Sequence, residues 1–95
     1  MRIERETTES RGRYQVIGQI DGTGTSYKRA LADALAKIET FIKGRIAAAD
    51  YGWRATWAGD PGPPRITGAI GYYPINHIGT EFTITMAVTI EMERL

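Results

Sequence analysis

The chain has 95 residues, with 12 basic and 11 acidic side chains and a formal net charge of +1 at pH 7. A core divided between two domains of this size would not offset the entropy of ordering them, so we expect residues 1–95 to form a single domain. The balanced charge excludes the electrostatic pattern typical of a nucleic-acid-binding or membrane-surface protein, and we predict neither partner.

The residue types present also limit the chemistry. The chain has no cysteine and one histidine, His77, which excludes a disulfide framework, a thiolate nucleophile and a histidine-rich metal site. His77 has no carboxylate or second histidine beside it, so we predict no metal site, no catalytic residue and no enzymatic activity. No apolar run approaches the roughly 20 residues that span a bilayer, and the N-terminus lacks the apolar stretch of a signal peptide. We therefore predict a cytoplasmic protein.

The first elements along the chain are a strand and a helix. Residues 1–12 are polar and predict a tail or a short edge strand. Residues 13–20 carry β-favouring side chains and predict the first strand, which ends at the turn residues 21–24. Thr25 or Ser26 can cap a helix start, and apolar residues follow at helical spacing. They are Tyr27, Ala30, Leu31, Ala34, Leu35, Ile38, Phe41 and Ile42.

The end of this helix has two interpretations. Gly44 favours a stop, after which residues 46–57 alternate in the manner of a second strand. The rival is a helix that continues through the alanines at 47–49 and stops at Gly52. We favour the stop at Gly44.

Residues 58–80 predict an insertion, a hairpin or a loop, before the last strand. Residues 58–64 are rich in glycine and proline and predict a rigid turn, and residues 65–73 predict a short strand. From Glu81 to Glu93 every even position is a large apolar residue, which predicts a strand with one buried face. At about 3.3 Å per residue this strand reaches roughly 40 Å, more than a compact chain of this size needs, so we expect it to contact another subunit.

These elements predict an α+β fold, in which an antiparallel β-sheet wraps one amphipathic α-helix in the order β-α-β-β. In this order the residues resemble the dodecins, small proteins that assemble into hollow dodecamers. The matching segments are Tyr14-Gln15-Val16-Ile17, Thr25-Ser26-Tyr27, the alanine-leucine pairs at Ala30 and Ala34, Arg45-Ile46-Ala47 at the second strand, and Glu81–Glu93 at the closing strand. The resemblance implies a homo-oligomer, such as a dodecamer, that stores a flavin or a nucleotide-like ligand.

The chain departs from the dodecins at two flavin contacts. In flavin-binding members a tryptophan of the second strand stacks on the flavin, and a glutamine of the final strand hydrogen-bonds it. These places fall here on Ile46 or Ala47 and on Thr83. Aliphatic side chains do not replace a stacking indole, and threonine reaches less far than glutamine, so the identity of the cofactor stays open.

Two groups of residues are candidates for a ligand site. The first is Thr23, Gly24, Thr25 and Ser26, and the second is Tyr51, Trp53, Trp57 and Thr83. The first group precedes a helix, where N–H groups and hydroxyls can hold an anion, and its alternative role is a capped turn without ligand. The aromatic residues of the second group would share a strand face and stack a planar ligand, with Thr83 as a polar contact. Their alternative role is packing against the helix or another subunit.

We therefore predict a non-enzymatic protein that stores or sequesters a small planar or phosphate-bearing molecule between copies of itself. The alternative is a small protein-interaction module, such as an inhibitor or a phage accessory factor, that presents the aromatic segment 51–73 to a partner.

Overall fold

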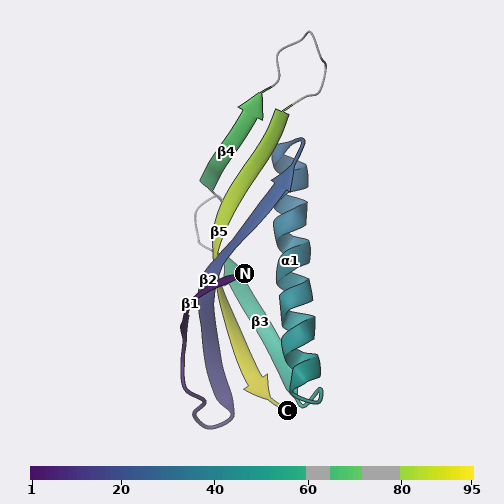
Figure 1. The fold of residues 1–95 in the computed structure, drawn as a ribbon. Helices are drawn as coiled ribbons and strands as arrows, with labels where there is room; N and C mark the ends of the chain where they lie inside the picture. Colours follow the sequence, from purple (N-terminus) through teal and green to yellow (C-terminus); the bar gives the residue numbers. More distant parts are fainter. Residues whose placement is uncertain (60–64, 72–79) are drawn as a thin grey trace.

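The computed structural model describes residues 1–59, 65–71 and 80–95 (Figure 1). These residues form one α-helix and an antiparallel sheet, so the expected α+β fold is confirmed. The elements are β1 (Arg2–Glu6), β2 (Arg13–Gly24), α1 (Tyr27–Ala48), β3 (Trp53–Gly59), β4 (Arg65–Gly71) and β5 (Thr80–Arg94). Figure 1 shows α1 lying along one face of the sheet.

The central strands of the sheet are β2 and β5, and the strand order is β1-β2-β5-β3. Strand β4 also pairs with β5, along the part of β5 that precedes its pairing with β3. Both β3 and β4 run antiparallel to β5 and lie on its edge away from β2. They therefore form one interrupted arm of a long hairpin whose other arm is β5. Along β5 the two pairings are separated by Met86 and Ala87, because Gly59 pairs with Val88 and Arg65 with Thr85.

The core lies between α1 and the sheet. The predicted burial of the even-numbered face of the last strand is confirmed at positions 84–92, but Thr85 on the opposite face is also buried, so the burial is not strictly one-sided. The buried residues of β5 on this face are Ile84, Met86, Val88, Ile90 and Met92, and their partners are Val16 and Ile20 of β2 and Ala30, Ala34 and Ile38 of α1. The three helix residues were expected on the apolar face of the helix from their spacing.

The prediction that the first strand ends at Ile20 is wrong, because β2 continues to Gly24. The glycines at 22 and 24 do not form a turn; they let the first turns of α1 approach the strand. A Cβ atom at Gly22 would lie 2.0 Å from the carbonyl oxygen of Ala30, and one at Gly24 would lie 2.7 Å from the Ala30 nitrogen. Helix α1 then begins after Ser26, whose Oγ accepts a hydrogen bond of 3.2 Å from the Arg29 N–H.

The prediction that the helix stops at Gly44 is also wrong. Helix α1 runs to Ala48, so Arg45-Ile46-Ala47 is helical and does not open a second strand. The rival interpretation, a helix through the alanines, describes the chain better, because an exposed glycine costs a helix interior only about 1 kcal/mol and the neighbouring alanines favour continuation.

The helix ends in a cap of two left-handed residues, Asp50 (φ 57°) and Tyr51 (φ 60°). The Tyr51 N–H donates to the Ile46 carbonyl at 2.9 Å and the Asp50 N–H donates to the Ala47 carbonyl at 3.1 Å. This pair of bonds is a Schellman motif, which satisfies the last helical carbonyls and commonly brings an apolar contact between the residues in the places of Tyr51 and Ile46. Strand β3 starts two residues later, at Trp53.

The N-terminal residues add an edge strand. Strand β1 pairs with residues 16–19 in the middle of β2, and an ion pair of 2.9 Å joins Arg2 to Asp21. A second ion pair, between Glu6 and Arg45, ties β1 to the last turns of α1. The polar segment at 1–12 therefore contains the edge strand that was one of its two expected forms.

The chain is elongated. Its Cα radius of gyration is 16.1 Å and its extents are 58 × 24 × 17 Å, whereas a compact domain of this length has a radius of about 12 Å. Strand β4 contributes to this shape because it pairs with the start of β5 and its far end extends past the first turn of the helix (Figure 1). Within the described ranges, no helix is long and apolar enough to cross a membrane.

Candidate functional site

The residues expected to bind a ligand lie in two separate parts of the molecule. Trp53 and Trp57 belong to β3, and Tyr51 lies in the cap just before that strand. Thr83 lies on β5, seven residues from Ile90, the partner of Trp57. At about 3.3 Å per strand residue this separation is roughly 23 Å, so one small ligand cannot touch Thr83 and the aromatic side chains within one copy. His77, Tyr72 and Tyr73 fall outside the described residues.

Trp53 is occupied by packing inside the fold. Its ring meets Tyr14 of β2 edge to face, with the ring centroids 5.3 Å apart. The guanidinium of Arg94 lies 4.9 Å from the centroid of the same indole. These contacts join β2, β3 and the end of β5, and such aromatic and cation–π contacts contribute to stability beyond the area they bury. Trp53 therefore packs within the fold, but these ring contacts are with side chains of other strands, whereas the alternative had expected the helix or another subunit.

Two of the expected aromatic residues remain accessible. Trp57 is 38% exposed although it faces the same side of the sheet as buried Ile90, and Tyr51 is 73% exposed. Large aromatic side chains contribute most of the energy at many interfaces, so exposed ones beside a hollow are candidates for contact with a ligand or partner.

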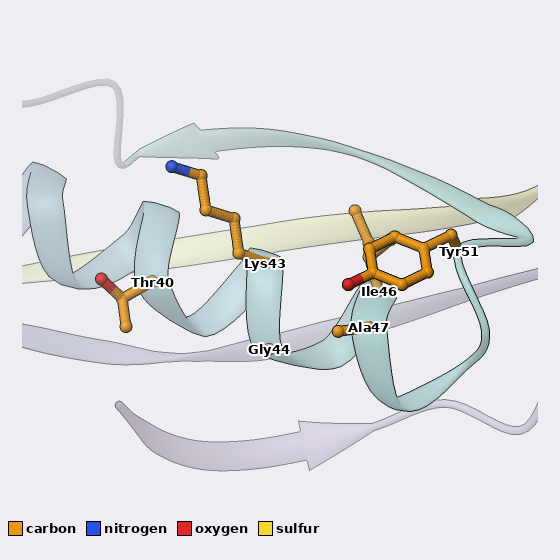
Figure 2. Close-up of a pocket in the computed structure, with 6 residues that line it drawn as sticks. All are labelled: Thr40, Lys43, Gly44, Ile46, Ala47 and Tyr51. Carbon is orange, nitrogen blue, oxygen red and sulfur yellow. The ribbon is translucent and has the colours of Figure 1, made fainter.

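A hollow of about 650 Å³ lies beside Tyr51, on the outer surface of the last turns of α1. Its lining residues are Thr40, Lys43, Gly44, Ile46, Ala47 and Tyr51. Figure 2 shows the Tyr51 ring next to Ile46 and Ala47 at one end and Thr40 at the other, with the Lys43 side chain between them extending away from Tyr51. The sequence analysis named Tyr51 as a ligand residue and placed Ile46 and Ala47 in a second strand, where they are in fact helical. It did not connect Thr40, Lys43 or Gly44 with Tyr51, because the helix was expected to stop at Gly44.

The candidate anion-binding residues are already engaged within the chain. The Thr23 N–H donates to Oδ2 of Asp33 at 2.9 Å. The hydroxyls of Thr25 and Ser26 accept hydrogen bonds from the Arg29 side chain and backbone, each at 3.2 Å. The hydrogen bond from the Thr23 backbone, together with the Lys37 ammonium, holds the pKa of Asp33 below its usual value. The Asp33 carboxylate thus accepts a hydrogen bond from the group of residues that the sequence suggested for a bound anion.

The structure also brings Thr83 to this group. Thr83 pairs with Thr23 across β2 and β5, and Thr85 donates to Oδ1 of Asp21 at 2.7 Å. The expected anion group and Thr83 are therefore neighbours on the sheet, a relation that only the strand register reveals.

A charged cluster that the sequence did not reveal lies near the chain end. Glu93 bonds both the Arg54 side chain, at 2.9 Å, and the Arg13 side chain, at 3.4 Å. The hydrogen bond from Arg54 is the main reason why the pKa of Glu93 is lowered. These residues belong to three adjacent strands, so their proximity follows from the pairing of β2, β5 and β3 and has no signal in local sequence.

In the part of the chain that the structure describes, no three His, Cys, Asp or Glu side chains come together in a way that could hold a metal ion. No protein-family model, no curated protein and no solved structure matches this chain.

Proposed function

We propose that this chain is a non-enzymatic binding protein that assembles into a homo-oligomer and holds a small planar or phosphate-bearing molecule, nucleotide-like or flavin-like. The observation that carries this proposal is the elongated shape, with a radius of gyration of 16.1 Å. Strand β4, which pairs only with β5 among the described residues, leaves a strand edge for a neighbour to cover.

The arrangement of elements supports a dodecin-like assembly. If β3 and β4 are counted as one interrupted strand, the elements after β1 follow the order β-α-β-β, with the last strand in the centre of the sheet. The helical conformation of Arg45-Ile46-Ala47 removes one of the segments on which the resemblance rests. The dodecin-like character is therefore proposed for the scaffold, and dodecameric assembly goes with it.

The exposed aromatic residues support the binding role. Tyr51 and Trp57 offer ring surface that the single chain does not cover. Stacking on such rings accepts many planar ligands, and association of copies would add further walls to each site. Binding would also stabilise the assembly, because a ligand that prefers the folded oligomer shifts its equilibrium.

Mass spectrometry under native conditions tests the proposal, because it reports subunit number and retained ligand together. We expect a discrete oligomer whose mass exceeds the summed chains by that of a small molecule, released on denaturation. A monodisperse monomer at micromolar concentration, with no added mass, would contradict both parts.

A second candidate function is a protein-interaction module that presents the segment 51–73 to a partner. The observation in its favour is that β3 lies at a sheet edge and carries the accessible ring of Trp57. Trp57→Ala should then abolish capture of a partner while leaving the folded state intact. Trp53→Ala is the contrasting variant, because it removes packing contacts and should lower stability. If Trp57→Ala retains the partner, this candidate is rejected.

A further inference from the structure

The hollow beside Tyr51 has the features of a small-ligand site, and we infer that it binds a flat aromatic ring carrying a negatively charged group, as in a mononucleotide. This inference rests on the binding role proposed above and assigns the ligand to a particular place. With a volume of about 650 Å³, the hollow falls within the range of about 300–1,000 Å³ that small-molecule pockets occupy.

The floor of the hollow contains a glycine that the fold itself does not need. Gly44 lies inside α1, where glycine is unfavourable compared with alanine. A Cβ atom added there would meet nothing within 4 Å, in contrast to the glycines at 22 and 24, where it would collide with the helix. Glycine commonly occurs where a ligand approaches the backbone closely, and a side chain at 44 would instead project into the hollow.

The wall of the hollow is an aromatic ring held in a fixed and unfavourable backbone conformation. Tyr51 and Asp50 both adopt left-handed φ angles, which non-glycine residues rarely do and which strain the chain. The cap hydrogen bonds hold Tyr51 there, with its ring beside Ile46 and Ala47 (Figure 2). The cap therefore fixes the backbone from which the ring projects beside the hollow, and 73% of the residue is accessible for stacking.

The positive charge of Lys43 indicates that the ligand carries a negatively charged group. Lys43 lines the hollow and, unlike Lys37, joins no ion pair within residues 1–59, 65–71 and 80–95. The end near Tyr51 is the negative end of the helix dipole and also carries Asp50, so an anionic group is disfavoured there. A ring on Tyr51 with its charged group at Lys43 matches this polarity, and Thr40 adds a hydroxyl at the rim.

Saturation-transfer NMR titrations with adenosine monophosphate and with adenosine test the inference on the full chain. We expect both to bind, and the monophosphate to bind about five-fold more tightly, as for one solvent-exposed charge pair. Lys43→Gln should remove this difference, whereas Lys28→Gln, nearer the other end of the helix, should leave it unchanged. Tyr51→Ala should weaken both ligands about ten-fold or more, as for loss of one stacking contact, and Tyr51→Phe should retain both.

Gly44→Leu is a variant in which loss of binding could not be attributed to loss of stability. Leucine favours the helix over glycine and should raise the melting temperature while filling the hollow, so binding of both ligands should be lost. The inference is overturned if the wild-type chain does not saturate with the monophosphate, or if Tyr51→Ala or Gly44→Leu binds within two-fold of wild type. Native mass measured on the same samples separates the two proposals. An oligomer that does not bind the ligands overturns only the inference about the hollow. A monomer that binds them as described overturns only the proposed assembly.

Discussion

Replacing Gly22 by alanine should strongly destabilise the fold, because α1 and β2 come closest at this position. The new Cβ would lie 2.0 Å from the Ala30 carbonyl oxygen, 2.7 Å from the Ala34 nitrogen and 2.8 Å from the Ala34 Cβ. Since ordinary contacts begin at 3.4 Å, the helix would have to move outward by about 1.4 Å at Ala30 (3.4 minus 2.0). Ile38 and the two alanines would then lose their fit against the sheet.

The size of the effect follows from the kind of atoms that collide. Overpacking a core costs typically about 1–3 kcal/mol, and here the obstacle is mainly backbone, which cannot rotate away, so we expect about 3 kcal/mol. For a domain of this size each kcal/mol shifts the melting temperature by about 4–8 °C, which predicts a decrease of about 12–24 °C. Thermal and urea unfolding followed by far-UV circular dichroism measure it, at matched protein concentration because the proposed assembly would make the transition concentration-dependent.

The matched control is Gly44→Ala. It makes the same glycine-to-alanine change, but on the exposed face of α1, the helix that Gly22 of β2 packs against. Nothing lies within 4 Å of the added methyl group, so the free energy of unfolding should rise by about 1 kcal/mol. Opposite signs for the two variants would support the close approach at Gly22. A Gly22→Ala chain that melts within about 4 °C of wild type, less than the shift expected for 1 kcal/mol, would show that the helix does not pack on the strand as described.

Three further predictions concern the helix ends and the charged cluster. Ser26→Ala should lower the free energy of unfolding by about 1 kcal/mol, because the Arg29 N–H loses its acceptor; Ser26→Thr, measured by the same urea titration, should restore most of it. Asp50→Gly should raise the melting temperature by several degrees, since glycine adopts the left-handed angle without the penalty of a side chain, and an unchanged or lower value would contradict the cap described. The lowered pKa of Glu93 means that its contribution to stability is present above its unfolded value of 4.5 and is lost as the pH falls through the lower folded value. Urea unfolding between about pH 6 and pH 3 should therefore show a shallower acid decline for Glu93→Gln than for wild type, and identical slopes would refute the linkage.

The parts of the fold that depend on periodicity could be predicted from the sequence. The alternation in β5 and the helical spacing in α1 identify which faces are buried, because burial follows the geometry of a single element. The glycines were misinterpreted because their meaning depends on what lies next to them in space. Gly22 lies inside a strand, where the helix approaches it closely, and Gly44 lies inside a helix, beside open space. Nothing in the local sequence distinguishes either of them from a glycine that ends a strand or a helix.

The same limit applies to the candidate site. Tyr51 and Trp57 were identified from their residue type, which was sufficient to suggest stacking. The other residues that line the hollow belong to α1, and they lie beside Tyr51 because the helix continues past Gly44. Likewise, Asp33 of α1 accepts a hydrogen bond from the Thr23 N–H of β2, a contact between helix and strand that no sequence motif predicts.

The break between β3 and β4 has a consequence for how copies of this chain meet. An uninterrupted arm would present a long, straight row of free backbone donors and acceptors, the surface on which strands add without limit to form fibres. Here the row consists of two runs of seven residues, β3 and β4, which pair with β5 in different registers, since Gly59 faces Val88 and Arg65 faces Thr85. In the proposed assembly, each run would be short enough to pair with one neighbour and then stop, which would favour closed assemblies over open-ended growth.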